Sequence, residues 1–399
     1  MRVIGPAWIV MLADVDAPSV ITAGQGGTDS GYALLLPVFA VVPILFVVQE
    51  MTARLALATG KGHAELVMDR YGARWAAVSV LGMAVINFVA YVAEFAGIAL
   101  GARIVGISEP VAILCALAIH AAMVLTGGYT WFERFALLLS LALFSFVVLA
   151  VAGRPDLGHL VSDLSPFPAD VPHDYFALVV AMIGASIMPW MLFYQQSASV
   201  DKKLKREDLK GTRVETLVGA IASQALMAAI VIAAAAAMKS APAVPSSATN
   251  LAELPEGLAR LANSGPGWLI AVGLIGSGLL ALVVVSLSAA WGVGELMGWP
   301  RSLNLKPSQA RHFYAMMFVE VVPAALVALL SRDLVRLCIG AMVFNVVALA
   351  LPLAFLVRLT SDAELLGDLV NTRRRTWILW AVTAGLLICG LYGMFQYLT

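Results

Sequence analysis

Two short stretches of the sequence place polar or helix-breaking residues near the centre of long apolar runs. The first contains Asp14, Asp16 and Pro18, and the second contains Gly184 and Pro189. A carboxylate at the centre of a bilayer costs about 2.5–3.5 kcal/mol on insertion scales. Two aspartates at that depth therefore indicate that they face a cation or a polar cavity.

The prolines point to the same chemistry. Proline removes a backbone donor and clashes with the preceding helical turn, and hydrocarbon holds no water to satisfy the carbonyls that are freed. Such a break persists where it faces a cavity or a bound ion, and free carbonyls favour a cation. Two alternatives stay open: a simple proline kink in either run, and an aspartate that only caps the broken helix, which fits Asp14 better than Asp16.

The composition shows which elements must position these residues. Of 399 residues, 61% are hydrophobic and 13% are charged, with a mean hydropathy of +0.90. A soluble protein keeps about a quarter of its residues charged, so most of this surface does not face water. This excludes a soluble enzyme, a nucleic-acid binder and a disordered scaffold. The chain is predicted to be an all-α polytopic membrane protein.

Apolar runs between breakers predict a single transmembrane domain over residues 1–399 with about 11 helices. The sequence indicates no particular oligomeric state and no soluble domain between spans. The predicted spans are 4–24, 32–58, 75–103, 108–127, 132–153, 174–200, 213–238, 266–295, 310–331, 333–358 and 375–398.

The charges in the loops predict the orientation. An odd number of spans puts the termini on opposite sides, and cytoplasmic loops carry excess Lys and Arg. With the N-terminus inside, 18 basic residues lie in cytoplasmic loops and six on the other side. The chain is therefore predicted to lie in the cytoplasmic membrane with its N-terminus inside and its C-terminus outside. The basic run 202–213 is interpreted as part of this signal, with binding of anionic lipid as the alternative.

The two breaks lie in the first and sixth spans, which predicts an internal repeat. Interrupted helices at matching positions of two halves indicate a midplane binding site. We expect a 5+5 inverted repeat, over approximately 4–153 and 174–358, with the helix at 375–398 added.

Four motifs resemble the NRAMP family of divalent metal transporters, and they run from the start of the chain to about residue 200. The family's first helix carries Asp-Pro-Gly-Asn and its sixth carries Ala-x-x-Met-Pro-His. The matching residues are Asp16-Ala17-Pro18-Ser19 with Gln25 and Gly31-Tyr32, Arg54-Leu55 with Thr59-Gly60-Lys61 and Ala64-Glu65, Ala93-Glu94 with Gly97, and Ala185-Ser186-Ile187-Met188-Pro189-Trp190.

The resemblance implies a fold like that of the leucine transporter, unwound in helices one and six, with a metal held between the breaks. By position it implies that Asp16, Met188 and Ser19 are side-chain ligands, that Ala185 contributes its carbonyl, and that Asp14 lies close by. A carboxylate attracts any divalent cation, whereas a thioether favours transition metals over Mg²⁺ and Ca²⁺. Plain apolar packing is the alternative role of Met188.

The sequence departs from the family at positions implicated in proton coupling. Tyr91 stands at the helix-three aspartate, and Trp190 and Gln195 stand at two helix-six histidines, while Glu94 is retained. None of the three replacements carries protons readily near neutral pH, which predicts weak or absent proton coupling. On helix ten, Asn345 lies near a glutamine of the family's site.

The identity of the metal stays open between two interpretations. The departures resemble the magnesium-transporting branch of the family, in which Mg²⁺ keeps several waters and few carboxylates, whereas Met188 favours Mn²⁺ or Fe²⁺. The predicted function is secondary transport of a divalent metal, which is a substrate rather than a cofactor, with the lipid bilayer as surroundings and no nucleic-acid partner. Alternatives are transport of an amino acid or another organic solute, an intramembrane enzyme, and a channel.

Overall fold

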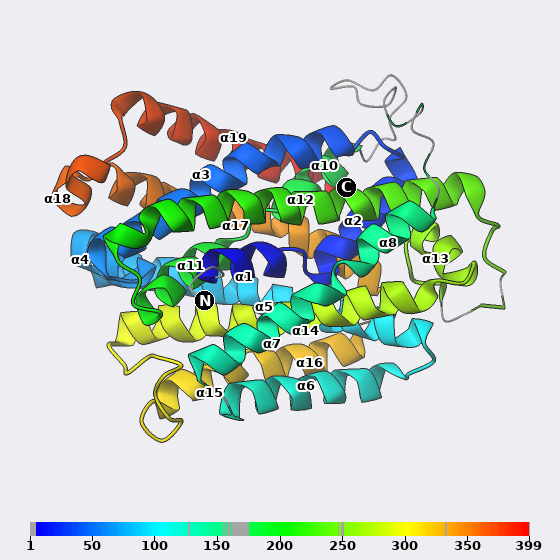
Figure 1. Ribbon diagram of the computed structural model, residues 1–399, viewed down its shortest axis with the longest axis horizontal. Helices are drawn as coiled ribbons and strands as arrows, with labels where there is room; N and C mark the ends of the chain where they lie inside the picture. Colours follow the sequence, from blue (N-terminus) through cyan, green and yellow to red (C-terminus); the bar gives the residue numbers. More distant parts are fainter. Residues whose placement is uncertain are drawn as a thin grey trace.

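The computed structural model describes residues 5–126, 128–153, 155, 158, 160, 175–245, 247–248, 251–331 and 333–398. Every regular element in these ranges is a helix, and the long helices run roughly along the longest axis of the molecule (Figure 1). The predicted all-α fold is confirmed.

The helices follow the predicted spans closely. The first half holds α1 (Pro6–Ala13), α2 (Ala17–Ser30), α3 (Leu35–Thr59), α4 (His63–Tyr71), α5 (Ala73–Ile104), α6 (Glu109–Thr126), α7 (Tyr129–Ala142) and α8 (Ser145–Ala152). The second half holds α10 (Tyr175–Gly184), α11 (Pro189–Asp201), η1 (Arg206–Asp208), α12 (Leu209–Ser240), α13 (Glu256–Asn263), α14 (Gly267–Met297), α15 (Arg311–Val319), α16 (Val321–Leu330), α17 (Leu334–Thr360), α18 (Ala363–Leu366), η3 (Gly367–Leu369) and α19 (Arg373–Leu398).

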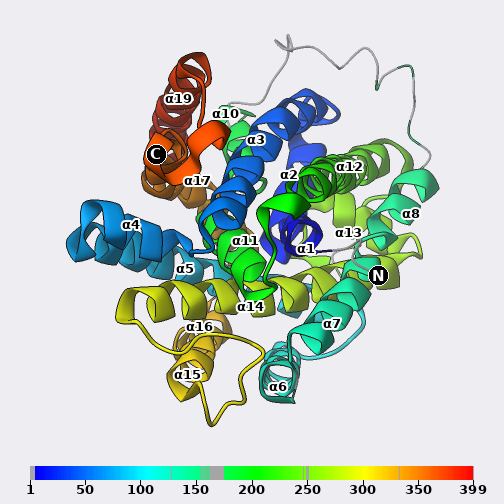
Figure 2. The same ribbon diagram turned by 60° about the vertical axis from the view of Figure 1, so that its left-hand side comes forward.

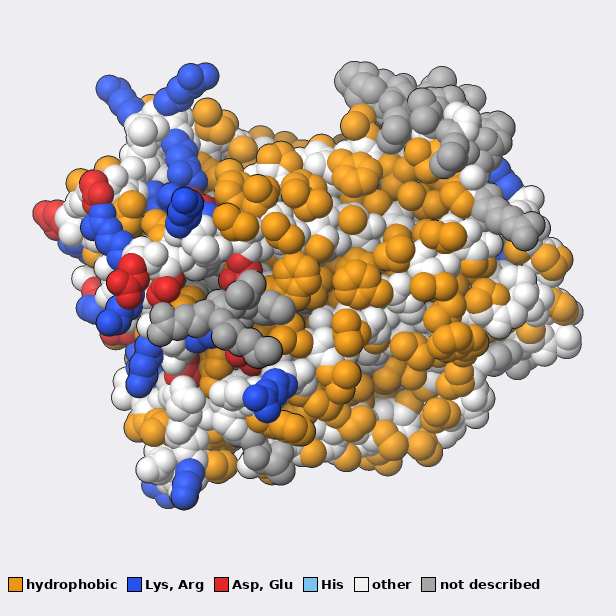
Figure 3. Space-filling view, viewed as in Figure 1, with side chains coloured by type: hydrophobic (Ala, Val, Ile, Leu, Met, Phe, Trp, Pro, Cys, Tyr) orange, Lys and Arg blue, Asp and Glu red, His pale blue; other side chains and the backbone are white. Residues whose placement is uncertain are grey.

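Among the described residues, nine helical segments are long and apolar enough to cross a membrane, and the bent pair α1–α2 makes a tenth. The remaining predicted span corresponds to α6, which is apolar but shorter. The first span was predicted to end at residue 24, but α2 continues to Ser30. Hydrophobic side chains form a broad belt on the visible surface, and most charged side chains lie beyond one edge of that belt (Figure 3).

The broken helices lie inside the bundle. In the view of Figure 2, α1, α2 and α11 lie between α3, α12 and α14, and α5 packs against α2 and α11. α1 packs against α12 and α11, α2 packs against α12 and α17, and α10 packs against α17. The residues around both interruptions are consequently buried, and few polar partners reach them.

Both ends of the central helices are covered. Leu258 of α13 packs against α2, and the Gly257 amide of α13 donates to Thr28 of α2 at 3.0 Å. At the other end, Glu295 of α14 accepts from the Ala64 amide at 2.9 Å and from the Ser197 hydroxyl at 2.5 Å. The segment between the predicted spans 213–238 and 266–295 contains the helix α13. Most of the segment between the predicted spans 132–153 and 174–200 lies outside the described residues.

Candidate metal site

The first interruption separates α1 from α2, which meet at an angle of 48°. Asp16 is the N-cap of α2, and its carboxylate accepts a hydrogen bond from the Ser19 amide at 2.8 Å. Pro18 lies in the first turn of α2, where its missing amide removes no helical hydrogen bond. Proline is thus compatible with α2 and marks where the chain restarts as a helix.

The side chain that caps the broken helix is that of Asp16, not that of Asp14. Asp14 ends α1 with its backbone, and neither of its carboxylate oxygens has a hydrogen-bond partner among the described residues. The expectation that Asp14 is the better capping candidate was wrong, because Ser19 lies three residues after Asp16 and its amide reaches that carboxylate. Asp14 therefore keeps both oxygens available.

The second interruption separates α10 from α11. α10 ends at Gly184, and Met188 caps α11 in an extended conformation with φ −108° and ψ 147°. A Cβ atom at Gly184 would lie 1.8 Å from the Met342 carbonyl oxygen of α17. Glycine is required here because the two backbones touch where α10 ends.

The two interruptions meet. The Ser19 hydroxyl donates to the Ala185 carbonyl at 3.1 Å, across 166 positions of sequence. The Ser19 hydroxyl also lies 3.7 Å from the Met342 sulfur of α17. Three of the predicted ligand positions, Asp16, Ser19 and Ala185, are thereby brought together.

A third carboxyl group reaches the first interruption from α5. Glu94 accepts a hydrogen bond from the Ala17 amide at 3.2 Å, and its side chain also interacts with the Asp16 carboxyl. Asp14, Asp16 and Glu94 are each 0% exposed. Four of their six oxygens have no hydrogen-bond partner, and no ion pair joins the three groups to a Lys, Arg or His within the described ranges.

Met188 lies beside the residue that replaces the family's histidine. The Trp190 indole nitrogen donates to the Met188 sulfur at 3.1 Å, and both side chains are 0% exposed. A thioether sulfur has two lone pairs. One of them accepts the hydrogen bond from Trp190, and the other remains to coordinate a metal.

The other predicted residues lie at different distances from the interruptions. Asn345 is one turn along α17 from Met342 and donates to its sulfur at 3.8 Å. Tyr91 is buried on α5 one turn before Glu94, and Gln195 is buried on α11 with no partner for its amide atoms among the described residues. No contact places Tyr91 or Gln195 at the breaks in the described part of the chain.

The structure adds two contacts that the sequence analysis did not assign to the site. Met342 touches Ser19, and Gln224 of α12 lies 3.1 Å from the Ser186 hydroxyl inside the second interruption. Gln224 is a polar residue in a membrane helix, where such residues commonly bond across helices. Met342 has no sequence feature that distinguishes it from other apolar residues of a membrane helix.

The donors do not form a compact cluster of charged metal ligands. Over the described ranges, no group of three or more His, Cys, Asp or Glu has a geometry that could hold a metal ion. A metal at the interruptions would draw on a mixed set of carboxylate, hydroxyl, carbonyl and thioether donors. Hard and soft donors together are compatible with a divalent transition metal.

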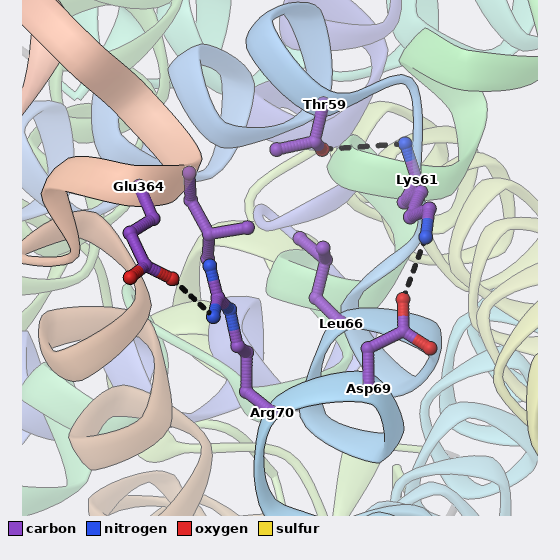
Figure 4. Close-up of a pocket in the computed structure, with 7 residues that line it drawn as sticks. Thr59, Lys61, Leu66, Asp69, Arg70 and Glu364 are labelled. Carbon is purple, nitrogen blue, oxygen red and sulfur yellow. Dashed lines mark hydrogen bonds and ion pairs between the residues drawn. The ribbon is translucent and has the colours of Figure 1, made fainter.

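The cavity shown in Figure 4 lies elsewhere, between the end of α3, α4 and α18, and has a volume of about 440 Å³. Its charges are paired with one another: Lys61 with Asp69 at 2.6 Å and Arg70 with Glu364 at 2.9 Å. The hydrogen bond to Asp69 raises the pKa of the Lys61 ammonium above its ordinary value. Both carboxylates that line this pocket thus already have a cationic partner.

A bundle whose first and sixth spans are interrupted at one buried, carboxylate-rich point defines a secondary transporter of the leucine-transporter type. Solved structures show the same fold. The chain superimposes with a TM-score of 0.76 on a manganese transporter of Eremococcus coleocola (19% identity, covering 98% of this chain and 86% of that chain). It superimposes with a TM-score of 0.61 on a Na⁺-coupled sialic acid symporter (13% identity, 100% and 90% covered).

The family is shown by sequence. The model of the natural resistance-associated macrophage protein-like family, Nramp, matches residues 7–396. A relative from Klebsiella pneumoniae, named divalent metal cation transporter MntH, is 28% identical over 400 residues, covering 96% of this chain and 91% of the relative. The chain belongs to the Nramp family, and the resemblance inferred from the motifs is confirmed.

Proposed function

We propose that this chain is a secondary transporter that carries a divalent metal cation across the cytoplasmic membrane. The observation that carries the proposal is the set of buried carboxyl groups Asp14, Asp16 and Glu94, which have no cationic side-chain partner among the described residues, at the meeting point of two broken helices. Burying charge without compensation is costly, and a bound divalent cation supplies that compensation. The names of the relatives, a divalent metal cation transporter and a manganese transporter, agree with this function.

The proposed ligands are Asp16, Ser19, the Ala185 carbonyl and Met188. Asp14 is a further carboxylate that could bind the ion. Ser19 and Ala185 are joined at 3.1 Å, so a metal would replace that hydrogen bond with two oxygen contacts. Asp16 Oδ1 caps α2, whereas Asp16 Oδ2 accepts no hydrogen bond from an N–H group or a hydroxyl among the described residues. One oxygen thus holds the helix while the other is free to bind the ion.

Transport requires the site to open alternately to each side. All five residues are buried, and α13 and the Glu295 contacts cover the two ends of the central helices. An opening of either end would admit the ion to the interrupted region. The orientation is proposed from the loop charges. Basic residues are in excess in the loops of one predicted side, which is typical of the cytoplasmic side. We therefore propose that the N-terminus is cytoplasmic and that the C-terminus is outside.

The alternative substrates fit less well. An amino acid or another organic acid presents a carboxylate, which three buried carboxyl groups would repel. An intramembrane enzyme would need a nucleophile or a metal-activated water, and the Nramp family to which the chain belongs consists of transporters. Metal transport is therefore the function best supported by the site.

A liposome uptake panel tests the proposal. Purified protein in proteoliposomes should accumulate Mn²⁺ or Mg²⁺ above protein-free liposomes and should accumulate no amino acid from a mixture. Ca²⁺ serves as the control for non-selective leakage of divalent ions. Uptake of an amino acid without uptake of any divalent cation would overturn the proposed substrate class.

Replacing Met188 with alanine is expected to lower Mn²⁺ and Cd²⁺ uptake more than Mg²⁺ uptake. The change removes the soft donor while leaving Asp16, Ser19 and the Ala185 carbonyl in place, and a thioether favours transition metals. Uptake rates for the three metals, measured on one preparation, check this. Met191→Ala is the matched control, because its sulfur contacts the Met188 backbone amide at 3.3 Å. Equal losses for all metals would show that Met188 only packs.

Metal uptake is expected to proceed with little or no proton movement. Trp190 occupies a histidine position of the family and uses its indole N–H on Met188, and Tyr91 replaces an aspartate. Neither side chain exchanges protons near neutral pH. Proteoliposomes containing a pH indicator should show metal influx without acidification, and a metal-dependent drop in internal pH would contradict the prediction.

A further inference from the structure

A group of four charged side chains joins three helices far from the interrupted region. The buried carboxylate of Glu50, on α3, contacts three guanidinium groups: Arg54 Nε at 3.1 Å, Arg213 Nη2 at 2.9 Å and Arg375 Nη2 at 2.6 Å. We call these four residues the Glu50 cluster. One negative charge faces three positive charges, so the cluster carries an excess of two.

The three arginines have different surroundings. Arg54 is 2% exposed, and its remaining nitrogens donate to the Leu369 carbonyl and to the Asn371 side chain, the latter at 2.8 Å. Its role is to hold the segment before α19 against α3. The Arg213 and Arg375 side chains are 44% and 34% exposed. The excess charge therefore lies on the two arginines that face outward.

Acidic side chains other than Glu50 do not neutralise these two arginines within the described residues. Glu50 is the acidic partner of both, and the acid nearest in sequence to Arg375, Asp368, pairs with Arg206. A guanidinium forms paired hydrogen bonds with a phosphate group in a fork-like geometry. Arg213 contacts Glu50 Oε1 through Nε at 3.0 Å and Nη2 at 2.9 Å, and Arg375 contacts Glu50 Oε2 through Nη2 at 2.6 Å. In the described structure the remaining N–H groups of these two arginines are the donors left for a phosphate.

The surface next to the cluster is apolar. On α12 the exposed residues after Arg213 continue along the same face at helical spacing: Val214, Leu217, Val218 and Ile221. On α19 the residues after Arg375 include exposed Trp377 and Ile378. The residues on the opposite side of the cluster are basic and exposed: Lys210, Arg373 and Arg374. In Figure 3, Lys and Arg side chains likewise gather along one edge of the apolar belt.

We propose that the Glu50 cluster binds the phosphate of an anionic phospholipid between α12 and α19, with the acyl chains along the exposed apolar faces of both helices. A phospholipid fits because its negative phosphate is joined to hydrocarbon chains. The phosphate would face the arginines, and the chains would lie on the apolar surface next to them. The lipid would add a direct link between α19 and α12, which Glu50 now connects through its ion pairs with Arg375 and Arg213. The proposal does not depend on metal transport.

Lipid retention by the purified protein tests the site. Native mass spectrometry from detergent should show phosphatidylglycerol binding about tenfold more weakly to Arg213→Gln/Arg375→Gln than to the unmodified chain, because charge-assisted hydrogen bonds are lost. Lys205→Gln/Lys306→Gln removes the same two charges from exposed lysines on the same predicted side and should retain the lipid. Phosphatidylcholine should bind all three proteins equally.

A third variant and a competition experiment complete the test. Glu50→Gln frees both outward arginines and should bind phosphatidylglycerol more tightly than the unmodified chain, which tests the site even where the double arginine variant fails to fold. Glycerol 3-phosphate separates a soluble phosphate from a lipid, and it should not displace the bound lipid at matched concentration. Each of four results would overturn the proposal. These are equal loss of phosphatidylglycerol in the lysine control, unchanged retention of phosphatidylglycerol in the arginine variant, weaker phosphatidylglycerol binding in Glu50→Gln, and displacement of the lipid by glycerol 3-phosphate.

Discussion

Replacing Asp16 with asparagine is expected to weaken Mn²⁺ binding about 100-fold and to leave the protein folded. An asparagine oxygen still accepts the Ser19 amide that Asp16 now accepts at 2.8 Å, so the cap of α2 is kept. What is lost is the negative charge and the free oxygen. Loss of a partner behind a metal ligand already costs 10–100-fold in affinity, so loss of the ligand itself should reach the upper end of that range.

Calorimetric titration of the Asp16→Asn protein with Mn²⁺ and Mg²⁺ measures this effect. Asp69→Asn is the matched control, because Asp69 is an exposed aspartate that pairs with Lys61 outside the candidate site. Thermal unfolding of both variants in detergent checks that the fold is kept. Affinity equal to that of the unmodified chain would remove Asp16 from the site, whatever the transport rate.

Replacing Gly184 with alanine is expected to lower the free energy of unfolding by about 1–3 kcal/mol, the usual cost of overpacking a tight contact, and to reduce metal uptake strongly. The added Cβ would lie 1.8 Å from the Met342 carbonyl oxygen. α10 must then move away from α17, which separates the Ala185 carbonyl from Ser19. A single methyl group thus disturbs both packing and the donors.

Gly82→Ala is the control for this substitution. Gly82 lies inside α5, and a Cβ atom there meets nothing within 4 Å, so the helix gains alanine's better propensity at no steric cost. Thermal unfolding and initial uptake rates of the two variants should differ clearly. Equal stability and equal uptake would show that α10 can shift without affecting the site.

The positions of the spans could be predicted because hydrocarbon imposes long apolar runs, but the end of the first span could not. α2 continues to Ser30 through Gly24, Gly26 and Gly27, which are poor helix formers and favour an earlier end. The structure shows why glycine is present: a Cβ at Gly27 would lie 2.4 Å from the Val231 carbonyl of α12. Tertiary packing therefore overrides the local preference.

Site residues could be predicted where they violate the pattern of an apolar membrane helix, and they could not be predicted where they fit that pattern. Asp16, Pro18 and Pro189 violate the pattern of a membrane helix, and both breaks lie where these residues predict them. Met342 is an ordinary apolar residue of α17, so only the fold reveals that its sulfur lies 3.7 Å from the Ser19 hydroxyl. The capping hydrogen bond of Asp16 likewise depends on a local turn that composition does not specify. The division into two inverted repeats stays a prediction.

Anomalous diffraction from crystals grown with Mn²⁺ tests the central claim most directly. We expect one strong peak between the interruptions 14–19 and 185–188, within metal–oxygen bonding distance of the Asp16 carboxylate and the Ala185 carbonyl. In crystals of the Asp16→Asn protein that peak should disappear. A peak at another place in the bundle, with none between these two segments, would contradict the claim that the paired breaks hold the metal.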